Sequence, residues 1–240
     1  MRESNNMTGW CALHVVVYVT AIAVSVGALF SYRSMITTVN SDIEKCVLYA
    51  KPKVHINQKT SVCEIDFAAS EWGDDSLCNF VFFTILASLV YGIIAVWFFT
   101  LCASSSRGTM HDFGTVQAGK IVCPASILSS IMALLILIMA WEVSAGLNIF
   151  FHELEYKGQQ NCTTKTGSIT WDPLSAASFF RKRYSLEATV WLMAIGWLVA
   201  TLLLCGRCCT GADFTRQSEY RVVQEEDSGS TFLESNERAT

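Results

Sequence analysis

The chain has 240 residues, of which 52 % are hydrophobic and only 16 % are charged. Soluble domains carry about 25 % charged residues, so this composition is typical of a protein that lies mostly in a membrane. The net charge is −4, and no basic stripe occurs along the chain, which excludes the usual basis for binding nucleic acid. The lipid bilayer is therefore the first expected partner.

Four uninterrupted apolar runs predict four membrane-spanning helices. At about 1.5 Å per residue, roughly 20 helical residues cross a hydrocarbon core about 30 Å thick. Apart from cysteine and tyrosine, His14 is the only ionisable side chain within the runs. We expect an all-α membrane protein, a four-helix bundle with spans at 10–30, 80–101, 121–141 and 188–205, an amino-terminal stub at 1–9, connections at 31–79, 102–120 and 142–187, and a disordered tail at 206–240.

Cleavage of the first run is the alternative to four spans. Arg2 precedes an apolar run that ends Val26-Gly27-Ala28, as in a signal peptide with small residues near its cleavage point. A signal core has roughly 7 to 15 residues, and this run is longer. We therefore favour a retained first span.

The two long connections share one side of the membrane, and their residues indicate which side. They contain four cysteines (Cys46, Cys63, Cys78 and Cys162) and the glycosylation acceptor Asn161-Cys162-Thr163. Both features are typical of an oxidising, glycosylating lumen or the cell exterior, which places both termini in the cytosol. Positive charge points the other way, since ten of the 17 Lys and Arg residues lie in these loops. Long loops translocate largely regardless of charge, so the cysteines decide the expected orientation.

Pairing all four cysteines requires one bond between the two loops, because only Cys162 lies in the second. Three connectivities remain open. A structural cap with two disulfides is favoured over a redox-active pair, since these loops contain no Cys-x-x-Cys. Two further alternatives are that one cysteine stays free, or that a glycan on Asn161 competes with pairing of Cys162.

Short elements are expected within the loops. Cys46 to Tyr49 and Val62 to Phe67 could form a strand pair, separated by Lys51-Pro52-Lys53. Trp171-Asp172-Pro173 indicates a turn, followed by a short helix over 175–180 that leads into the fourth span. Small residues four apart within the spans, such as Ser88 and Gly92, are typical of close helix packing.

Glu142 directly follows the third apolar run. If the helix continues through Phe151, this carboxylate lies at membrane depth, where charge costs about 2.5 to 3.5 kcal/mol and is often functional. Because the residues from Ile121 already suffice to cross the bilayer, a position at the luminal interface is the favoured expectation.

The cytosolic side offers two candidate modification or binding motifs. Cys205, Cys208 and Cys209 lie where the fourth span ends and are candidates for reversible acylation; Cys11 and Cys102 rank lower. In the tail, Tyr220 and Val223 are spaced as in tyrosine-based signals that sorting adaptors bind in extended form. Adaptors and other membrane proteins are therefore candidate partners.

No catalytic motif is found. The sequence has no phosphate-binding glycine loop, no His-Glu-x-x-His and no nucleophile elbow, and its four histidines are scattered. The residues give no reason to expect a cofactor, a metal or an enzyme.

Four segments together resemble the transmembrane protein 179 family, and its B-type branch most closely. They are Lys45-Cys46-Val47-Leu48-Tyr49, Ser76-Leu77-Cys78-Asn79-Phe80-Val81, Trp171-Asp172-Pro173 and Glu187-Ala188-Thr189-Val190-Trp191. The resemblance implies a multi-pass protein of plasma-membrane or secretory-granule membranes, with no catalytic or ligand residues to transfer. Claudins fit less well, because Trp72 is followed by Cys78 alone and Cys63 precedes it.

These observations favour a non-enzymatic tetraspan protein of accessory or scaffolding type, in the plasma membrane or in granule or endosomal membranes. A channel or transporter component, and a claudin-like adhesion protein, are the alternatives.

Overall fold

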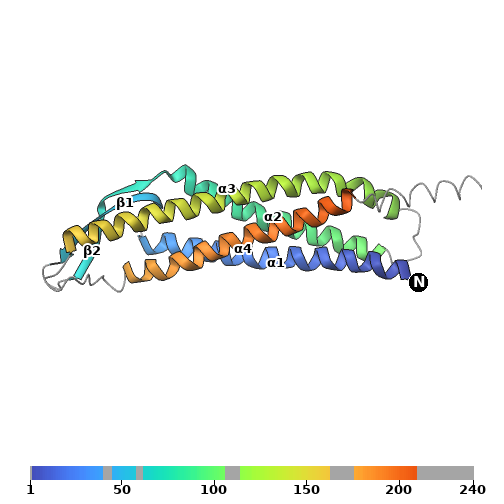
Figure 1. Cartoon of the computed structure of the whole chain (residues 1–240), viewed down its shortest axis with the longest axis horizontal. Helices are drawn as coiled ribbons and strands as arrows, with labels where there is room; N and C mark the ends of the chain where they lie inside the picture. The colour runs from blue at the N-terminus through green and yellow to red at the C-terminus, as the bar shows by residue number, and fades with distance from the viewer. Residues whose placement is uncertain (1, 40–44, 58–61, 106–113, 163–175, 210–240) are drawn as a thin grey trace, which may run out of the picture.

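The computed structural model describes residues 2–39, 45–57, 62–105, 114–162 and 176–209. Within these ranges the chain forms four long helices and one two-stranded sheet. The helices run side by side as an elongated bundle, and the sheet lies at one end of it (Figure 1). We call this the hairpin end, and the opposite end, where the amino terminus lies, the tail end.

All four predicted spans are confirmed. The helices are α1 (Arg2–Val39), α2 (Asp75–Ser105), α3 (Gly114–Cys162) and α4 (Ala176–Cys209). Each contains a stretch long and apolar enough to cross a membrane, at Ala12–Ile36, Asp75–Leu101, Pro124–Cys162 and Phe180–Cys208. Pro124 lies inside α3, and α3 stays helical on both sides of it.

The helix α3 is much longer than its apolar run predicts. Its 49 residues span about 70 Å at 1.5 Å per residue, more than twice the thickness of a hydrocarbon core. The expected loop over 142–187 is therefore wrong for its first part, which is helical to Cys162. The reason is a buried stripe at helical spacing, formed by Leu147, Phe151 and Leu154, which packs against other parts of the chain.

The helix α4 also begins earlier than expected. It runs without a break from Ala176, so the short helix predicted over 175–180 and the fourth span form one element. Phe180 contacts Phe151 of α3, with ring centroids 5.1 Å apart. This contact holds α3 and α4 together beyond the apolar run of the fourth span.

Small and hydroxyl side chains join the helices inside the bundle. A Cβ added at Gly92 of α2 would lie 2.8 Å from Ile22 Cγ1 of α1, so only glycine permits this approach. One polar layer lies beside it, where Ser88 Oγ accepts a hydrogen bond from Trp197 Nε1 (2.7 Å) and contacts Ser25 Oγ (2.9 Å). Three helices, α1, α2 and α4, thus meet at one serine.

A second polar layer joins the helices nearer the tail end. Ser129 of α3 contacts the hydroxyls of Tyr18 (3.0 Å) and Tyr91 (3.3 Å), and its carbonyl accepts from Thr201 Oγ1 (3.1 Å). These four residues come from the four helices. Because each polar group finds its partner within the protein, none of them needs water at membrane depth.

The sheet is an antiparallel hairpin of β1 (Cys46–Asn57) and β2 (Val62–Gly73). Both strands are longer than predicted, and the expected break at Lys51-Pro52-Lys53 is wrong. Pro52 is tolerated because it falls between Lys51 and Lys53, where the register with β2 shifts, and proline within sheets is found at such irregularities. Two such shifts bend the hairpin.

Gly146 of α3 supplies the first test of this fold. A Cβ added there would lie 3.0 Å from Leu48 Cβ and 3.2 Å from Tyr49 Cδ2, both on β1. We expect Gly146→Ala to lower the unfolding free energy of the purified protein by about 1 to 3 kcal/mol through overpacking.

Gly196→Ala is the matched control, since nothing lies within 4 Å of a Cβ at that position in α4. Equal thermal stability of both variants in detergent would contradict the close seating of β1 on α3.

Candidate functional site

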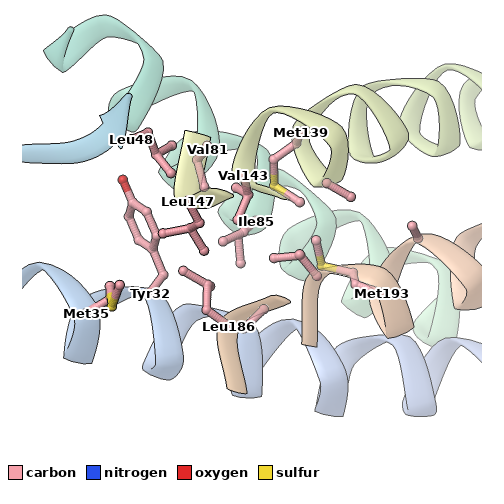
Figure 2. Packing of buried hydrophobic residues seen from close by; sticks show 14 of the residues in the cluster. Tyr32, Met35, Leu48, Val81, Ile85, Met139, Val143, Leu147, Leu186 and Met193 are labelled. Carbon is pink, nitrogen blue, oxygen red and sulfur yellow. The ribbon is translucent and has the colours of Figure 1, made fainter. Parts of the chain in front are cut away.

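The most specific structure outside the spans is the contact between β1 and α3, which we call the hairpin seat. It consists of residues 47–50 of β1, bulged out of the sheet, and residues 142–147 of α3. Three of the bulged side chains, Val47, Leu48 and Ala50, are almost fully buried. Leu48 points between α2 and α3, toward Val81, Val143 and Leu147 (Figure 2).

Tyr49 is the exception within the bulge. Its φ of 61° lies in the left-handed region, which costs a non-glycine residue about 1 to 3 kcal/mol. Its hydroxyl donates a hydrogen bond of 2.8 Å to Glu142 Oε2. Burial raises the pKa of Tyr49, and the hydrogen bond and charge of Glu142 raise it further. The carboxylate of Glu142 on α3 is therefore bound by a residue of strand β1.

Gly73 completes the seat from the other strand. A Cβ there would lie 1.8 Å from the carbonyl oxygen of Leu48, a distance no side chain can occupy. Glycine at this position lets β2 approach the bulged backbone of β1. Asp74 then caps the start of α2 (Asp75–Ser105), because its carboxylate accepts a hydrogen bond of 2.9 Å from the backbone N–H of Ser76.

Two disulfides fasten the hairpin. Cys46 pairs with Cys78 at the start of α2, and Cys63 pairs with Cys162 at the end of α3. The expected bond between the two loops is therefore confirmed, and one of the three open connectivities is selected. In the chain-entropy estimate, closing a loop of about 100 residues stabilises the folded state by about 4.7 kcal/mol, because the unfolded chain loses conformational freedom. Both ends of the hairpin are covalently held to helices.

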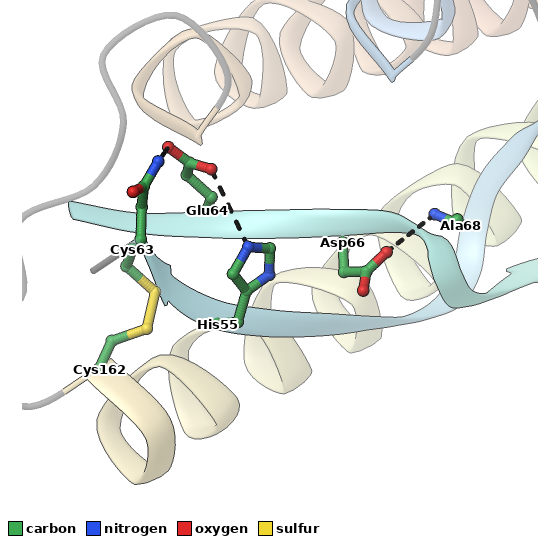
Figure 3. A network of polar contacts seen from close by, with 7 residues as sticks. His55, Cys63, Glu64, Asp66, Ala68 and Cys162 are labelled. Atoms are coloured by element: carbon green, nitrogen blue, oxygen red, sulfur yellow. Dashed lines mark hydrogen bonds and ion pairs between the residues drawn. A yellow bond between two sulfur atoms is a disulfide. The ribbon is translucent and has the colours of Figure 1, made fainter. Parts of the chain in front are cut away.

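The outward face of the hairpin carries charged and polar side chains that lie opposite one another on the two strands. The register places Lys51 opposite Glu71, Lys53 opposite Asp66 and His55 opposite Glu64. His55 Nε2 lies 4.0 Å from Glu64 Oε2 (Figure 3), and Asn57 donates to the same carboxylate. Opposite charges across strands stabilise the pair by about 0.2 to 1 kcal/mol. These side chains also give the outward face charged and polar groups that a partner protein can contact.

The second strand is interrupted on its way along this face. Asp66 Oδ1 accepts hydrogen bonds from the backbone N–H groups of Ala68 (3.1 Å) and Ala69 (3.0 Å), the first of which is drawn in Figure 3. Trp72 stacks on Phe67 and donates its indole N–H to the Phe67 carbonyl. This bulge shortens the straight part of β2, as in edge strands that avoid pairing with other chains.

The basic residues near the fourth span have structural roles that sequence reasoning missed. Arg183 lies over the ring of Phe151, 4.8 Å from its centroid, and 3.6 Å from Glu187 Oε2. Lys182 Nζ donates a hydrogen bond of 2.9 Å to the Ser34 carbonyl of α1. In the sequence, only the i, i+4 spacing of Arg183 and Glu187 indicated one of these roles, an ion pair along a helix. These charges hold α1, α3 and α4 together at the hairpin end.

The remaining sequence-predicted residues are dispersed. Asn161 is exposed in the last turn of α3, at the hairpin end. At the tail end, Cys205 is a free thiol and Cys208 is disulfide-bonded, so only a reduced Cys208 could be acylated. The side chain of Cys209, and all of Tyr220 and Val223, lie outside the described residues.

Metal ligands do not gather in the part of the chain that the structure describes. No group of three or more His, Cys, Asp or Glu side chains within it could hold a metal ion. His14, buried in α1, contacts the Trp10 carbonyl through Nδ1 and stacks on Phe99 of α2. Its position is that of a packed core residue.

The pairing of Tyr49 with Glu142 predicts a stability difference that depends on pH. Tyr49→Phe should lower the unfolding free energy by about 1 kcal/mol near neutral pH, because one hydrogen bond is lost. The folded-state pKa of Tyr49 is raised, so its contribution is complete below pH of about 10 and is lost as pH rises further. Thermal unfolding of both proteins across this range measures the difference.

Tyr156→Phe is the control, since Tyr156 lies on α3, the helix that carries Glu142, and is 56 % exposed. The measurement would contradict the hydrogen bond's assigned role if the difference in unfolding free energy between wild type and Tyr49→Phe stayed constant up to pH 11, roughly one unit above the pKa of tyrosine in model peptides.

Comparison with known proteins identifies the chain's family. No solved structure matches it. A family model described as the transmembrane protein 179/179B claudin domain matches residues 10–229, which include all four spans, the hairpin and the two disulfides that fasten it. The chain therefore belongs to the transmembrane protein 179/179B family of claudin-like, multi-pass membrane proteins.

Proposed function

We propose that this protein is a non-enzymatic accessory or scaffolding component of the B-type branch of its family, and that it presents the hairpin to another membrane protein. The observation that carries this proposal is the fastening of the hairpin. Two disulfides, a buried bulge and the bond from Tyr49 to Glu142 all hold one small, polar surface in a fixed place. A fixed surface loses little entropy on binding a partner.

The helix α3 also sets the height of that surface. Cys162, where the hairpin is attached, lies 21 residues beyond Trp141, at which the apolar run ends. At 1.5 Å per residue this is about 30 Å of helix. The turn end of the hairpin, at Cys63, is therefore held far beyond the apolar run, within reach of another protein's external domain, while the base of the hairpin, at Cys46, lies beside the start of α2.

The bundle interior favours this role over that of a channel. The hydroxyl and indole groups of the two polar layers bond to one another, and the side chains between them are apolar and buried. Glu142, the carboxylate that directly follows the third apolar run, is engaged by Tyr49. Ion-conducting paths are lined by polar groups that face water. Hydrogen bonding here is used for packing.

The proposed orientation puts the hairpin in the lumen or outside the cell, with both termini in the cytosol. The two disulfides that fasten the hairpin, against one bonded cysteine, Cys208, at the tail end, support this orientation, because such bonds persist in oxidising compartments. Residence in the plasma membrane or in granule or endosomal membranes is part of the same proposal, and the family resemblance supports it.

Partner binding is tested by reversing the hairpin charges. Proximity labelling in native cells first identifies neighbours, and affinity purification of the full chain then measures the leading one. We expect Lys51→Glu combined with Lys53→Glu to reduce co-purification by about tenfold, because like charges then face Glu71 and Asp66 and any complementary partner. Leu192→Ala, on the exposed side of α4, is the control.

Ion flux through purified protein in liposomes tests the competing class. Flux that Glu142→Gln abolishes, with no neighbour whose capture depends on the hairpin charges, would overturn the scaffolding proposal. The scaffolding proposal would be supported if the liposomes show no ion flux and if capture of a neighbouring protein depends on the hairpin charges.

The tail motif predicts a sorting phenotype. We expect Tyr220→Ala to slow internalisation of surface-labelled protein by about threefold or more, because the motif's binding energy is concentrated in few anchor side chains. Arg221→Ala, between the two anchor positions, is the control. If Tyr220→Ala is internalised at the wild-type rate, the tail does not recruit a sorting adaptor through this motif.

A further inference from the structure

Asn161, the residue of the acceptor Asn161-Cys162-Thr163, occupies an unusual place for a glycosylation site. It lies in the last turn of α3, and its side-chain amide donates a hydrogen bond of 3.4 Å to the Val54 carbonyl of β1. The next residue, Cys162, is 2 % exposed and bonded to Cys63 (Figure 3). The amide nitrogen that would receive a glycan is thus held between a helix and a strand.

Glycan transfer needs this nitrogen to lie on an extended segment of the chain. In the reaction the Asn161 Nδ2 loses one proton to solvent and bonds to the anomeric carbon of a lipid-pyrophosphate-linked oligosaccharide, and the carbon–oxygen bond to the lipid pyrophosphate breaks. The acceptor must enter the transferase cleft in an extended form, which is why acceptor sites are associated with surface loops. A helical turn tied to Cys63 cannot enter such a cleft.

The finished product, in contrast, fits the fold. Asn161 is exposed, so a glycan could project into solvent. After transfer the amide keeps one N–H, which suffices for the bond to Val54. The fold therefore blocks the transfer reaction but accepts its product.

Disulfide formation begins at the same stage of synthesis. Cys63 precedes Cys162 by 99 residues, so it is already translocated when Cys162 emerges beside Asn161. Pairing removes two protons and two electrons from the thiols, which pass to a disulfide of the lumen's oxidoreductases. Glycan transfer to Asn161 and disulfide formation at Cys162 are then competing reactions at adjacent residues.

We propose that Asn161 is a conditional N-glycosylation site, modified only before Cys162 pairs with Cys63, so that disulfide formation sets its glycan occupancy. The proposal rests on the luminal placement of the hairpin given above. Copies that oxidise first remain without a glycan at Asn161, and copies that are glycosylated first can still close the same bond.

The test compares glycan occupancy at Asn161 in full-length proteins made in cells, measured by mass spectrometry of the peptide that contains it. Cys63→Ser leaves the acceptor sequence intact and frees Cys162. We expect it to raise occupancy at least about twofold over wild type, since the competing oxidation is removed. A reductant added during synthesis should raise wild-type occupancy equally and leave Cys63→Ser unchanged.

Cys46→Ser is the matched control, because it breaks the other disulfide and leaves the bond from Cys63 to Cys162 possible. Occupancy that rises equally in both variants would indicate general misfolding and would overturn the proposal. Full occupancy in wild type, or equal occupancy in wild type and Cys63→Ser, would also overturn it.

A further variant separates failure of this proposal from failure of the orientation. Gln58→Asn completes a new acceptor with Lys59 and Thr60, between the two strands. If this position is glycosylated while Asn161 never is, the hairpin is luminal and the conditional site is wrong. If neither position is modified and a glycan is found at the acceptor Asn6-Met7-Thr8, or at no site, the luminal placement fails and the proposal fails with it.

Discussion

The continuation of α3 as a helix from the end of its apolar run at Trp141 to Cys162 is the constraint on which the other features depend. It presents Gly146 to β1, positions Glu142 for Tyr49, and brings Cys162 to the level of Cys63. A flexible loop in its place would leave the bulge of β1 without a surface to pack on. A hairpin of two strands is marginal in water by itself, so its stability must come from this contact.

Magnitudes show which interaction holds the seat. The left-handed backbone of Tyr49 costs about 1 to 3 kcal/mol, and one hydrogen bond to Glu142 returns about 1 kcal/mol. Burying Leu48 contributes about 1.5 to 3 kcal/mol more, with Val47 and Ala50 adding to it. Apolar packing therefore decides the balance, and the hydrogen bond directs the tyrosine. The disulfides act in addition, by restricting the unfolded chain.

Much of this architecture could be predicted from the sequence, and the rest depends on tertiary contacts. The spans follow from apolar length, and the need for an inter-loop disulfide follows from three cysteines in one loop and one in the other. The choice of Cys63 as the partner of Cys162 could not be predicted, because it depends on the hairpin lying along α3. Residues 142–162 contain charged and polar residues among apolar ones, so their helix appears only when Leu147, Phe151 and Leu154 are seen to share one buried face. The bulge at Tyr49 has no local signal, since tyrosine is not a residue that favours positive φ.

The family match and the structure together describe a tetraspan protein whose distinctive part is a fixed polar hairpin on a helical support. Hydrogen exchange of the full-length protein in lipid nanodiscs tests this account most directly. Backbone amides of residues 145–158 should exchange at least about a hundredfold more slowly than an unstructured chain, as expected for a helix packed against a covalently held strand. Exchange of this segment at the rate of an unstructured loop would contradict the account.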